Sequence, residues 1–229
     1  MTKINKLIVA IIASLFMSVS AMAFEGFSIG IIGGTTDFDT TGNEYTVNTD
    51  QGIETNAGTA SKSVDVGSFF AEYTVAQGST FGIEVVPDTA EIGAKSRVDS
   101  NNAADTSDDG TYTAKANISD HVTVYVEPTF MMNEQFGIYV KGGASRVTVE
   151  SKESIAFGAD SSTYGNVDVW GVMYGAGIKL VSESGLFGKI EATKTEYGTV
   201  TLNSTTGGGN TITADPEAEA ARIAIGYNF

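Results

Sequence analysis

The sequence ends in Ala221-Arg222-Ile223-Ala224-Ile225-Gly226-Tyr227-Asn228-Phe229. Successive side chains of a β-strand point to opposite faces, so a strand here would place every second residue on one side. That side would carry Ala221, Ile223, Ile225, Tyr227 and Phe229. The other side would carry a cation, an amide and small residues. A strand with one apolar and one polar face suits a closed barrel in lipid, where every backbone group must find its partner within the protein.

Seven earlier segments alternate in the same way. Their apolar faces contain Phe27, Ile29 and Ile31; Phe69, Ala71 and Tyr73; Phe81, Ile83 and Val85; Val122, Val124 and Val126; Phe136, Ile138 and Val140; Trp170, Val172 and Leu180; and Ile190 and Ala192. The connections are alternately long and short, and long loops are expected at 35–63, 99–110, 150–166 and 198–215. The pattern predicts an all-β fold, an eight-stranded antiparallel up-and-down transmembrane β-barrel with periplasmic short turns.

Aromatic residues gather near the predicted short turns, where an interfacial girdle is expected. They are Tyr73, Phe81, Phe130, Phe136, Phe187, Tyr227 and Phe229. The alternative is a water-soluble sandwich or lipocalin-like barrel, which would bury these rings inside.

The N-terminus has the features of a secretory signal peptide. Lys3 and Lys6 precede an apolar run, 7–17, and Ala21-Met22-Ala23 offers a small-residue cleavage site. The run is shorter than the roughly 20 residues that a spanning helix needs. We therefore expect a signal peptide at 1–23 and a barrel domain at 24–229. The sequence contains no cysteine, so no disulfide holds the exported chain together.

The chain is acidic, with 13 Lys and Arg against 28 Asp and Glu and a net charge of −15. Removal of the two signal-peptide lysines would take the net charge to −17, which disfavours a nucleic-acid partner. Asp105, Asp108 and Asp109 do not have the spacing of an EF-hand loop, and solvated loop charge is the preferred interpretation. The sequence predicts no cofactor and no metal.

These features resemble the small eight-stranded outer-membrane barrels of Gram-negative bacteria: the OmpA-type transmembrane domain and the OmpX/Ail and OmpW-like groups. The resemblance rests on Ala21-Met22-Ala23, the eight alternating strands and the terminal Ile225-Gly226-Tyr227-Asn228-Phe229. It implies an outer-membrane location and a signal for the outer-membrane assembly machinery at Ile225, Tyr227 and Phe229. Unlike full-length OmpA, the sequence is expected to have no peptidoglycan-binding domain after the barrel, which puts a role in cell-wall anchoring in doubt.

Charged residues fall on the polar faces of the predicted strands. The four acids are Glu72, Glu84, Glu127 and Glu191, and the four bases are Lys141, Lys179, Lys189 and Arg222. Turn symmetry predicts that Glu72 faces Glu84 and Lys179 faces Lys189, so opposite charges must meet across the lumen. An eight-stranded barrel is just wide enough for side chains to fill. The pattern favours a structural plug over a gated conduction path.

The remaining bases of the predicted mature chain map to the loop-side ends of the strands. They are Lys62, Lys95, Arg97, Lys115, Arg146, Lys152 and Lys194. We predict a rim that binds lipopolysaccharide phosphates through charge-assisted hydrogen bonds; snorkelling and loop solvation are the alternative.

The function expected from these patterns is non-enzymatic: a structural or adhesion-like surface role through the loops, with an extracellular ligand that the sequence does not identify. The first alternative is a small-solute channel of the OmpW or narrow-porin type. The second is a lipid A-modifying enzyme, which would need a histidine near a serine or an acid. The only histidine is His121, which is expected to face inward beside Asp120 while Ser119 faces outward, and no sequence spacing sets a nucleophile against it. Strand glycines such as Gly171, Gly175 and Gly177 are interpreted as packing devices.

Overall fold

The computed structural model describes residues 25–48, 52–75, 78–99, 110–155, 163–205 and 209–229. The predicted signal peptide, 1–23, lies outside the described residues, as do Asp105, Asp108 and Asp109. No helix in the described part of the chain is long and apolar enough to span a membrane. The strands are β1 (Gly26–Asn48), β2 (Gly52–Thr74), β3 (Ser79–Val86), β4 (Ala90–Asp99), β5 (Gly110–Met131), β6 (Phe136–Ile155), β7 (Thr163–Val181), β8 (Leu186–Tyr197), β9 (Val200–Asn203) and β10 (Thr211–Asn228).

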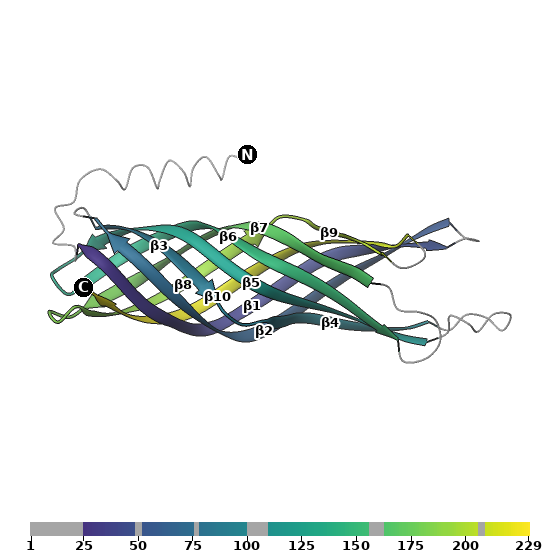
Figure 1. Ribbon diagram of the computed structural model, residues 1–229, viewed down its shortest axis with the longest axis horizontal. Coiled ribbons are helices and arrows are strands. Elements are labelled where there is room, and N and C mark those ends of the chain that lie inside the picture. The colour runs from purple at the N-terminus through teal and green to yellow at the C-terminus, as the bar shows by residue number, and fades with distance from the viewer. Residues whose placement is uncertain (1–24, 49–51, 76–77, 100–109, 156–162, 206–208) are drawn as a thin grey trace.

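Eight of these strands close into a ring (Figure 1). The order is β1-β2-β3-β5-β6-β7-β8-β10, and β10 pairs with β1 from Ser28↔Asn228 to Tyr45↔Thr211. Two short strands, β4 and β9, follow β3 and β8 and pair only with β5 and β10. Ring closure leaves no free edge at the level where all eight strands are paired. The predicted antiparallel up-and-down barrel is confirmed.

The outer wall carries an apolar belt, as the alternation predicts. In the terminal strand β10, Ile223 and Ile225 are 60% and 54% exposed, whereas Ala224 between them is buried. The belt continues round the ring through Phe27, Ile29, Ile31, Phe69, Tyr73, Phe81, Ile83, Val85, Val124, Phe130, Ile138, Trp170, Val172, Leu180, Leu186 and Ile190. This band of exposed apolar side chains is what an acyl-chain environment requires.

One expected girdle residue faces the other way. Phe187 is buried in the lumen, where its ring lies 6.1 Å from that of Phe70. A Cβ added at Gly226 would meet the Phe187 ring at 2.4 Å, so the glycine makes room for it. Nearness to a short turn does not decide the face of a strand, because strand parity does.

The predicted long loops are largely strand, which corrects the sequence interpretation. β1 and β2 remain hydrogen-bonded through 35–63, up to Asn48↔Gly52. β6 extends to Ile155, β7 begins at Thr163, and β9 and the start of β10 occupy part of 198–215. Of the region 99–110, only its two ends are described. The Ser, Thr and Asp content suggested irregular loops, but these residues stand on the outer face of a continuing barrel.

The barrel changes polarity along its axis. On the loop side of the apolar belt, the outer face of the β1–β2 hairpin is polar, and Ser61 and Ser63 donate hydrogen bonds to Asp39 and Asp37. The interior at that level is an apolar cluster, formed by Phe38, Ile92, Ile118, Val147, Val149, Tyr164, Val169, Val200, Leu202 and Ala218. The belt segment is therefore apolar outside and ionic inside, whereas the loop-side segment is built like a soluble barrel.

Candidate functional site: an ionic lumen below an apolar cup

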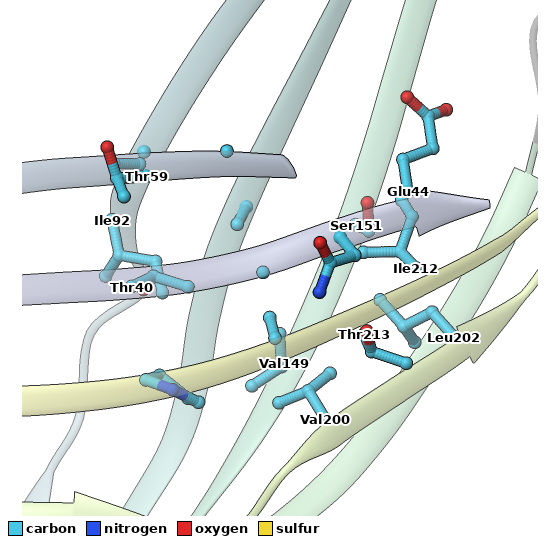
Figure 2. A pocket seen from close by; sticks show the side chains of 18 of the residues that line it. Thr40, Glu44, Thr59, Ile92, Val149, Ser151, Val200, Leu202, Ile212 and Thr213 are labelled. Atoms are coloured by element: carbon cyan, nitrogen blue, oxygen red, sulfur yellow. The ribbon is translucent and has the colours of Figure 1, made fainter. Parts of the chain in front are cut away.

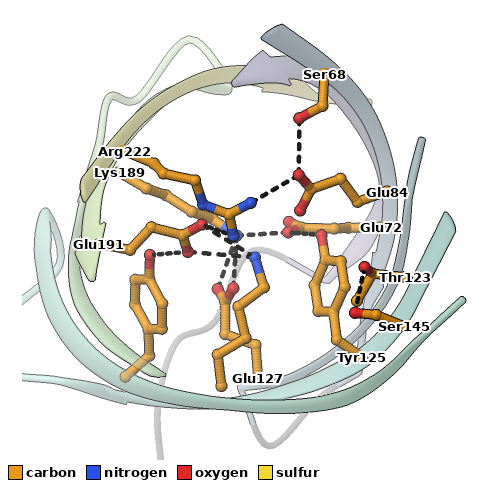
Figure 3. Close-up of polar contacts among 12 residues, drawn as sticks. Ser68, Glu72, Glu84, Thr123, Tyr125, Glu127, Ser145, Lys189, Glu191 and Arg222 are labelled. Atoms are coloured by element: carbon orange, nitrogen blue, oxygen red, sulfur yellow. Dashed lines mark hydrogen bonds and ion pairs between the residues drawn. The ribbon is translucent and has the colours of Figure 1, made fainter. Parts of the chain in front are cut away.

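The predicted charged residues all project into the lumen at the level of the apolar belt. Seven are buried: Glu72, Glu84, Glu127, Lys141, Lys179, Lys189 and Glu191. The eighth, Arg222, is partly buried in β10. Figure 3 shows side chains from opposite walls converging on the barrel axis. We call these eight residues the lumen plug.

Lys189 of β8 lies between two acids from the far wall. Its Nζ is 2.5 Å from an oxygen of Glu72 and 2.7 Å from an oxygen of Glu127. Glu72 is 2% exposed and Glu127 is fully buried at 0%. The three residues come from β8, β2 and β5, so this contact ties separate parts of the ring together. One cation thus lies between two carboxylates that have little access to water, and it balances one of their two negative charges.

A second set of ion pairs joins the remaining walls. Arg222 donates to Glu84 at 2.7 Å and to Glu191 at 2.5 Å, and Lys141 lies 3.2 Å from Glu191. Lys179 packs its ammonium 4.5 Å from the centre of the Phe187 ring, and no carboxylate of the described residues forms an ion pair with it. The Arg222–Glu84 pair crosses the lumen from β10 to β3, whereas Arg222 and Glu191 are direct register partners on the neighbouring strands β10 and β8.

Two tyrosines belong to the network although the sequence analysis did not select them. Tyr125 donates to Glu72 at 2.7 Å, and Tyr139 donates to Glu191 at 2.8 Å. Their rings lie against Gly82 and Gly177, where an added Cβ would meet ring atoms at 2.3 and 2.5 Å. Both tyrosines stand on the inward parity of their strands, which was the available signal.

The strand register corrects one predicted like-charge pair. Glu72 faces Gly82, and Glu84 faces Phe70, so the two acids are not opposite each other. The connection between β2 and β3 pairs Thr74 with Thr80, which sets a register two residues away from the one assumed. The other pair is present, because Lys179 faces Lys189 across the β7–β8 hairpin.

The predicted basic rim lies beyond the plug on the loop side, and its described members are already ion-paired. Arg146 contacts Asp168, and Lys194 lies 3.0 Å from Glu217 and 2.9 Å from Glu219. The side chains of Lys95, Arg97 and Lys152 lie outside the described residues.

Lys62 and Lys115 share a single acid across a seam in the wall. Glu91 of β4 lies 2.8 Å from Lys62 of β2 and 3.4 Å from Lys115 of β5. Hydrogen bonds from Lys62 and Lys115 hold the pKa of the Glu91 carboxyl below its ordinary value. Within the described residues β4 forms no ladder with β2, so these ion pairs connect strands that the backbone leaves unconnected.

A cavity of about 390 Å³ occupies the interior of the loop-side segment. Figure 2 shows its aliphatic lining, including Ile92, Val149, Val200, Leu202 and Ile212. Much of the remaining lining is Gly or Ala. We call this cavity the cup. A smaller cavity of about 50 Å³, lined by Phe38 and Ile118 among others, reaches Glu84 and Arg222 and shares no lining residue with the cup.

His121 lies at the level of that smaller cavity. Its Nε2 is 3.3 Å from the hydroxyl of Thr123 and 3.5 Å from that of Tyr197, and the ring packs edge-on against Tyr197. Asp120 has a positive φ of 51° at a register shift in β5, and this irregularity separates it from the histidine's face. No group of three or more His, Asp or Glu suited to a metal ion occurs among the described residues.

The predicted assembly signal stands on the outer wall at the turn-side end. Ile225, Tyr227 and Phe229 are exposed, and the Tyr227 and Phe229 rings are 5.1 Å apart. The Phe229 backbone N–H donates to the carbonyl of Phe27, so the last residue is held against β1.

No protein-family model matches the chain, and no curated protein matches it. Among solved structures, the chain is similar to the outer membrane protein OprG from Pseudomonas aeruginosa, with 13% identity, a TM-score of 0.53 and coverage of 90% of this chain and 99% of that chain. It is also similar to Neisserial surface protein A, NspA, with 10% identity, a TM-score of 0.43 and coverage of 89% and 97%. The outer membrane protease OmpT from Escherichia coli follows with 12% identity, a TM-score of 0.43 and coverage of 93% and 100%. The likeness to OprG shows the fold: this chain has the fold of the small outer-membrane β-barrels.

Proposed function

We propose that this chain is an outer-membrane barrel that passes no solute and acts at the cell surface through the loop-side part of its strands. The apolar belt supports membrane insertion, because some 20 large apolar side chains face outward. The single observation that carries the closed state is the pair of contacts that Lys189 makes across the lumen, at 2.5 and 2.7 Å. An adhesion-like or envelope-structural role follows from the strands that extend past the belt.

A channel is the alternative function, and the plug argues against it. Charged groups in a conduction path must exchange partners with passing ions, but Glu72, Glu127, Lys189 and Glu191 are each at most 3% exposed. Breaking one such pair leaves a buried charge without compensation, which is strongly unfavourable. The lumen is therefore proposed to be a structural core.

Planar-bilayer recordings test this proposal. The wild-type protein is expected to show no steady conductance, because the plug fills the lumen. Replacing Lys189, Glu72 and Glu127 together by alanine removes one base and two acids from the axis and is expected to produce steady openings. The matched control replaces Lys194, Glu217 and Glu219, which form the same one-base, two-acid contact outside the lumen. Steady wild-type conductance would refute the closed lumen.

We also propose that the protein is not an enzyme. The neighbours of His121 are hydroxyls of Thr123 and Tyr197 at 3.3 and 3.5 Å. A catalytic histidine normally stands within hydrogen-bond reach of a nucleophile and of a group that orients it. Here the imidazole is enclosed by lumen side chains, which supports a space-filling and hydrogen-bonding role.

Outer-membrane lipopolysaccharide is the proposed partner of the rim, and the Lys62–Glu91–Lys115 contact supports this most strongly. Two ammonium groups share one carboxylate there, so one positive charge remains for a phosphate. Lys194 has the opposite balance, one base between two acids. The exposed Ile225, Tyr227 and Phe229 are likewise proposed as the contact for the assembly machinery.

Replacing Lys62 and Lys115 by glutamine is expected to weaken lipopolysaccharide binding by about tenfold or more, since a hydrogen bond to a charged group contributes roughly 1.5–3 kcal/mol. Binding is measured on purified protein titrated with lipopolysaccharide. Lys194→Gln is the control and is expected to leave affinity unchanged. Equal affinity for the double variant and the wild type would discard the rim proposal.

A further inference from the structure

The loop-side segment of the barrel is hollow in a way that the belt segment is not. Around the axis at the belt, the ionic plug and its tyrosines fill the space, whereas the cup leaves about 390 Å³. Small-molecule sites occupy about 300–1,000 Å³, and an eight-stranded barrel can hold one small ligand. The space exists because small residues line it, including Gly58, Ala60, Gly93 and Ala116.

The lining of the cup selects against charged molecules. Aliphatic side chains from four strands face it: Ile92 on β4, Val149 on β6, Val200 and Leu202 on β9, and Ile212 on β10. Figure 2 shows the hydroxyl groups of Thr40, Thr59 and Thr213 around the aliphatic patch, and the Glu44 carboxylate, which also belongs to the lining, points away from that patch. Lys115, the lining ammonium, already contacts Glu91 at 3.4 Å. Such a surface stabilises an uncharged, mostly apolar guest.

The wall of the cup has two seams. The first lies between β2 and β4, which form no ladder among the described residues. The second lies between β7 and β9, which likewise form none: the β7–β8 ladder ends at Gly171↔Tyr197, and the hydrogen bond from the Gly198 N–H to the Trp170 carbonyl follows it. At the seam between β2 and β4 the two strands are close, since a Cβ added at Gly93 of β4 would lie 3.4 Å from the Cβ of Ala60 of β2. Strands without backbone hydrogen bonds between them separate more easily than laddered ones, so the wall can open beside the cavity.

The floor of the cup is closed. The cup shares no lining residue with the small cavity that reaches the plug, and Phe38 and Ile118, which line that small cavity, belong to the same buried apolar cluster as the cup residues Ile92 and Leu202. A guest in the cup therefore has no path toward Arg222 and the ionic layer. The cup is a dead-end chamber that opens on the outer side of the membrane.

From this geometry we infer that the cup is a binding site for one small, uncharged, apolar molecule taken up from the outer side. The site goes beyond the surface role proposed above and holds whether or not the plug conducts ions. The guest is recognised by aliphatic contact and shape, with the hydroxyls at the margin able to hydrogen-bond one polar end.

Methyl nuclear magnetic resonance of the protein in lipid nanodiscs tests the inference, with naphthalene as the probe. The methyl signals of Ile92, Leu202 and Ile212 are expected to shift and saturate. Ile223 faces lipid and serves as the internal control, because partition of naphthalene into the bilayer shifts it without saturation. Identical, non-saturating shifts at all these methyls would overturn the inference.

A filling variant provides the second measurement. Ala116→Phe places a ring in the cup and is expected to weaken naphthalene binding by at least about tenfold. Ala192→Phe is the matched control, because Ala192 is exposed on the lipid face of β8. If Ala116→Phe does not fold, Ala214→Phe, also in the lining, replaces it. Before naphthalene is added, contacts between the cup methyls and lipid acyl protons would show that lipid fills the cup. Shielding of those methyls on dimer formation would show that a second copy covers it. Either result would overturn the proposal.

Discussion

Lys189→Met is expected to destabilise the folded barrel by about 3–5 kcal/mol, the usual cost of breaking a buried ion pair by removing one partner. The Lys189 ammonium lies 5.5 and 5.7 Å from the centres of the Phe70 and Phe187 rings. Methionine is an unbranched side chain of similar length that can pack against the same rings, so packing is largely retained. The variant removes the cation from between Glu72 and Glu127, whose oxygens it contacts at 2.5 and 2.7 Å. Two carboxylates with 2% and 0% exposure would then repel each other in the lumen.

Equilibrium unfolding in urea, with the protein in lipid vesicles and Trp170 as the fluorophore, measures this loss. Lys194→Met is the control, because that ammonium contacts Glu217 and Glu219 at the surface and exposed pairs contribute about 0–1 kcal/mol.

A compensated variant separates charge from packing. Lys189→Met combined with Glu127→Gln leaves three acids and three bases in the lumen plug and is expected to regain most of the stability. If this double variant were as unstable as Lys189→Met alone, lost packing rather than repulsion would explain the effect. A loss below about 1 kcal/mol for the single variant would mean that the plug is not structural.

The alternation made the belt segment predictable. A strand with a period of two has only two possible orientations, and lipid on one side selects between them. Ile223 and Ile225 could therefore be assigned outward, and the residues of opposite parity, Glu191 and Arg222 among them, inward. Equal numbers of acids and bases on the inward faces then indicated that they meet across the lumen.

The register between neighbouring strands was harder to predict from the sequence than the orientation of the side chains. The residue opposite Glu72 depends on the turn between β2 and β3, and a shift of two residues keeps every side chain on its predicted face. The alternation pattern therefore cannot detect such a shift. Glu84 faces Phe70 instead and accepts a hydrogen bond from Ser68 at 2.8 Å.

The cup could not be predicted from the sequence for a different reason. In 35–63 the alternation continues with the sign reversed, so that Asp37 and Ser63 point outward while Phe38 and Val64 contribute to the interior. If apolar side chains are assumed to face outward toward lipid, the segment 35–63 resembles a polar loop rather than a strand pair. The lining also comes from segments far apart in the chain, such as Ile92 and Leu202, which only the ring closure brings together.

The change of polarity along the barrel predicts that the same substitution has different effects at two heights. Ile223→Arg places a cation on the apolar face of β10, where Ile223 is 60% exposed. A lipid-facing Arg near the bilayer midplane costs about 2–4 kcal/mol. Ile53→Arg changes the same residue type at a site that is 72% exposed near the end of the β1–β2 hairpin, and surface substitutions usually stay within about 0.5 kcal/mol.

Unfolding of both variants in the same vesicles provides the comparison. A cost confined to Ile223→Arg would place the membrane at the belt and leave the hairpin, the seam and the cup in water, because a side chain that reaches lipid cannot hydrate its charge. Equal costs at both positions would mean that lipid also surrounds the β1–β2 extension. The polar pairs Ser61–Asp39 and Ser63–Asp37 would then face hydrocarbon, where exposed polar groups are strongly destabilising. The membrane boundary placed between the apolar belt and the loop-side segment would be wrong.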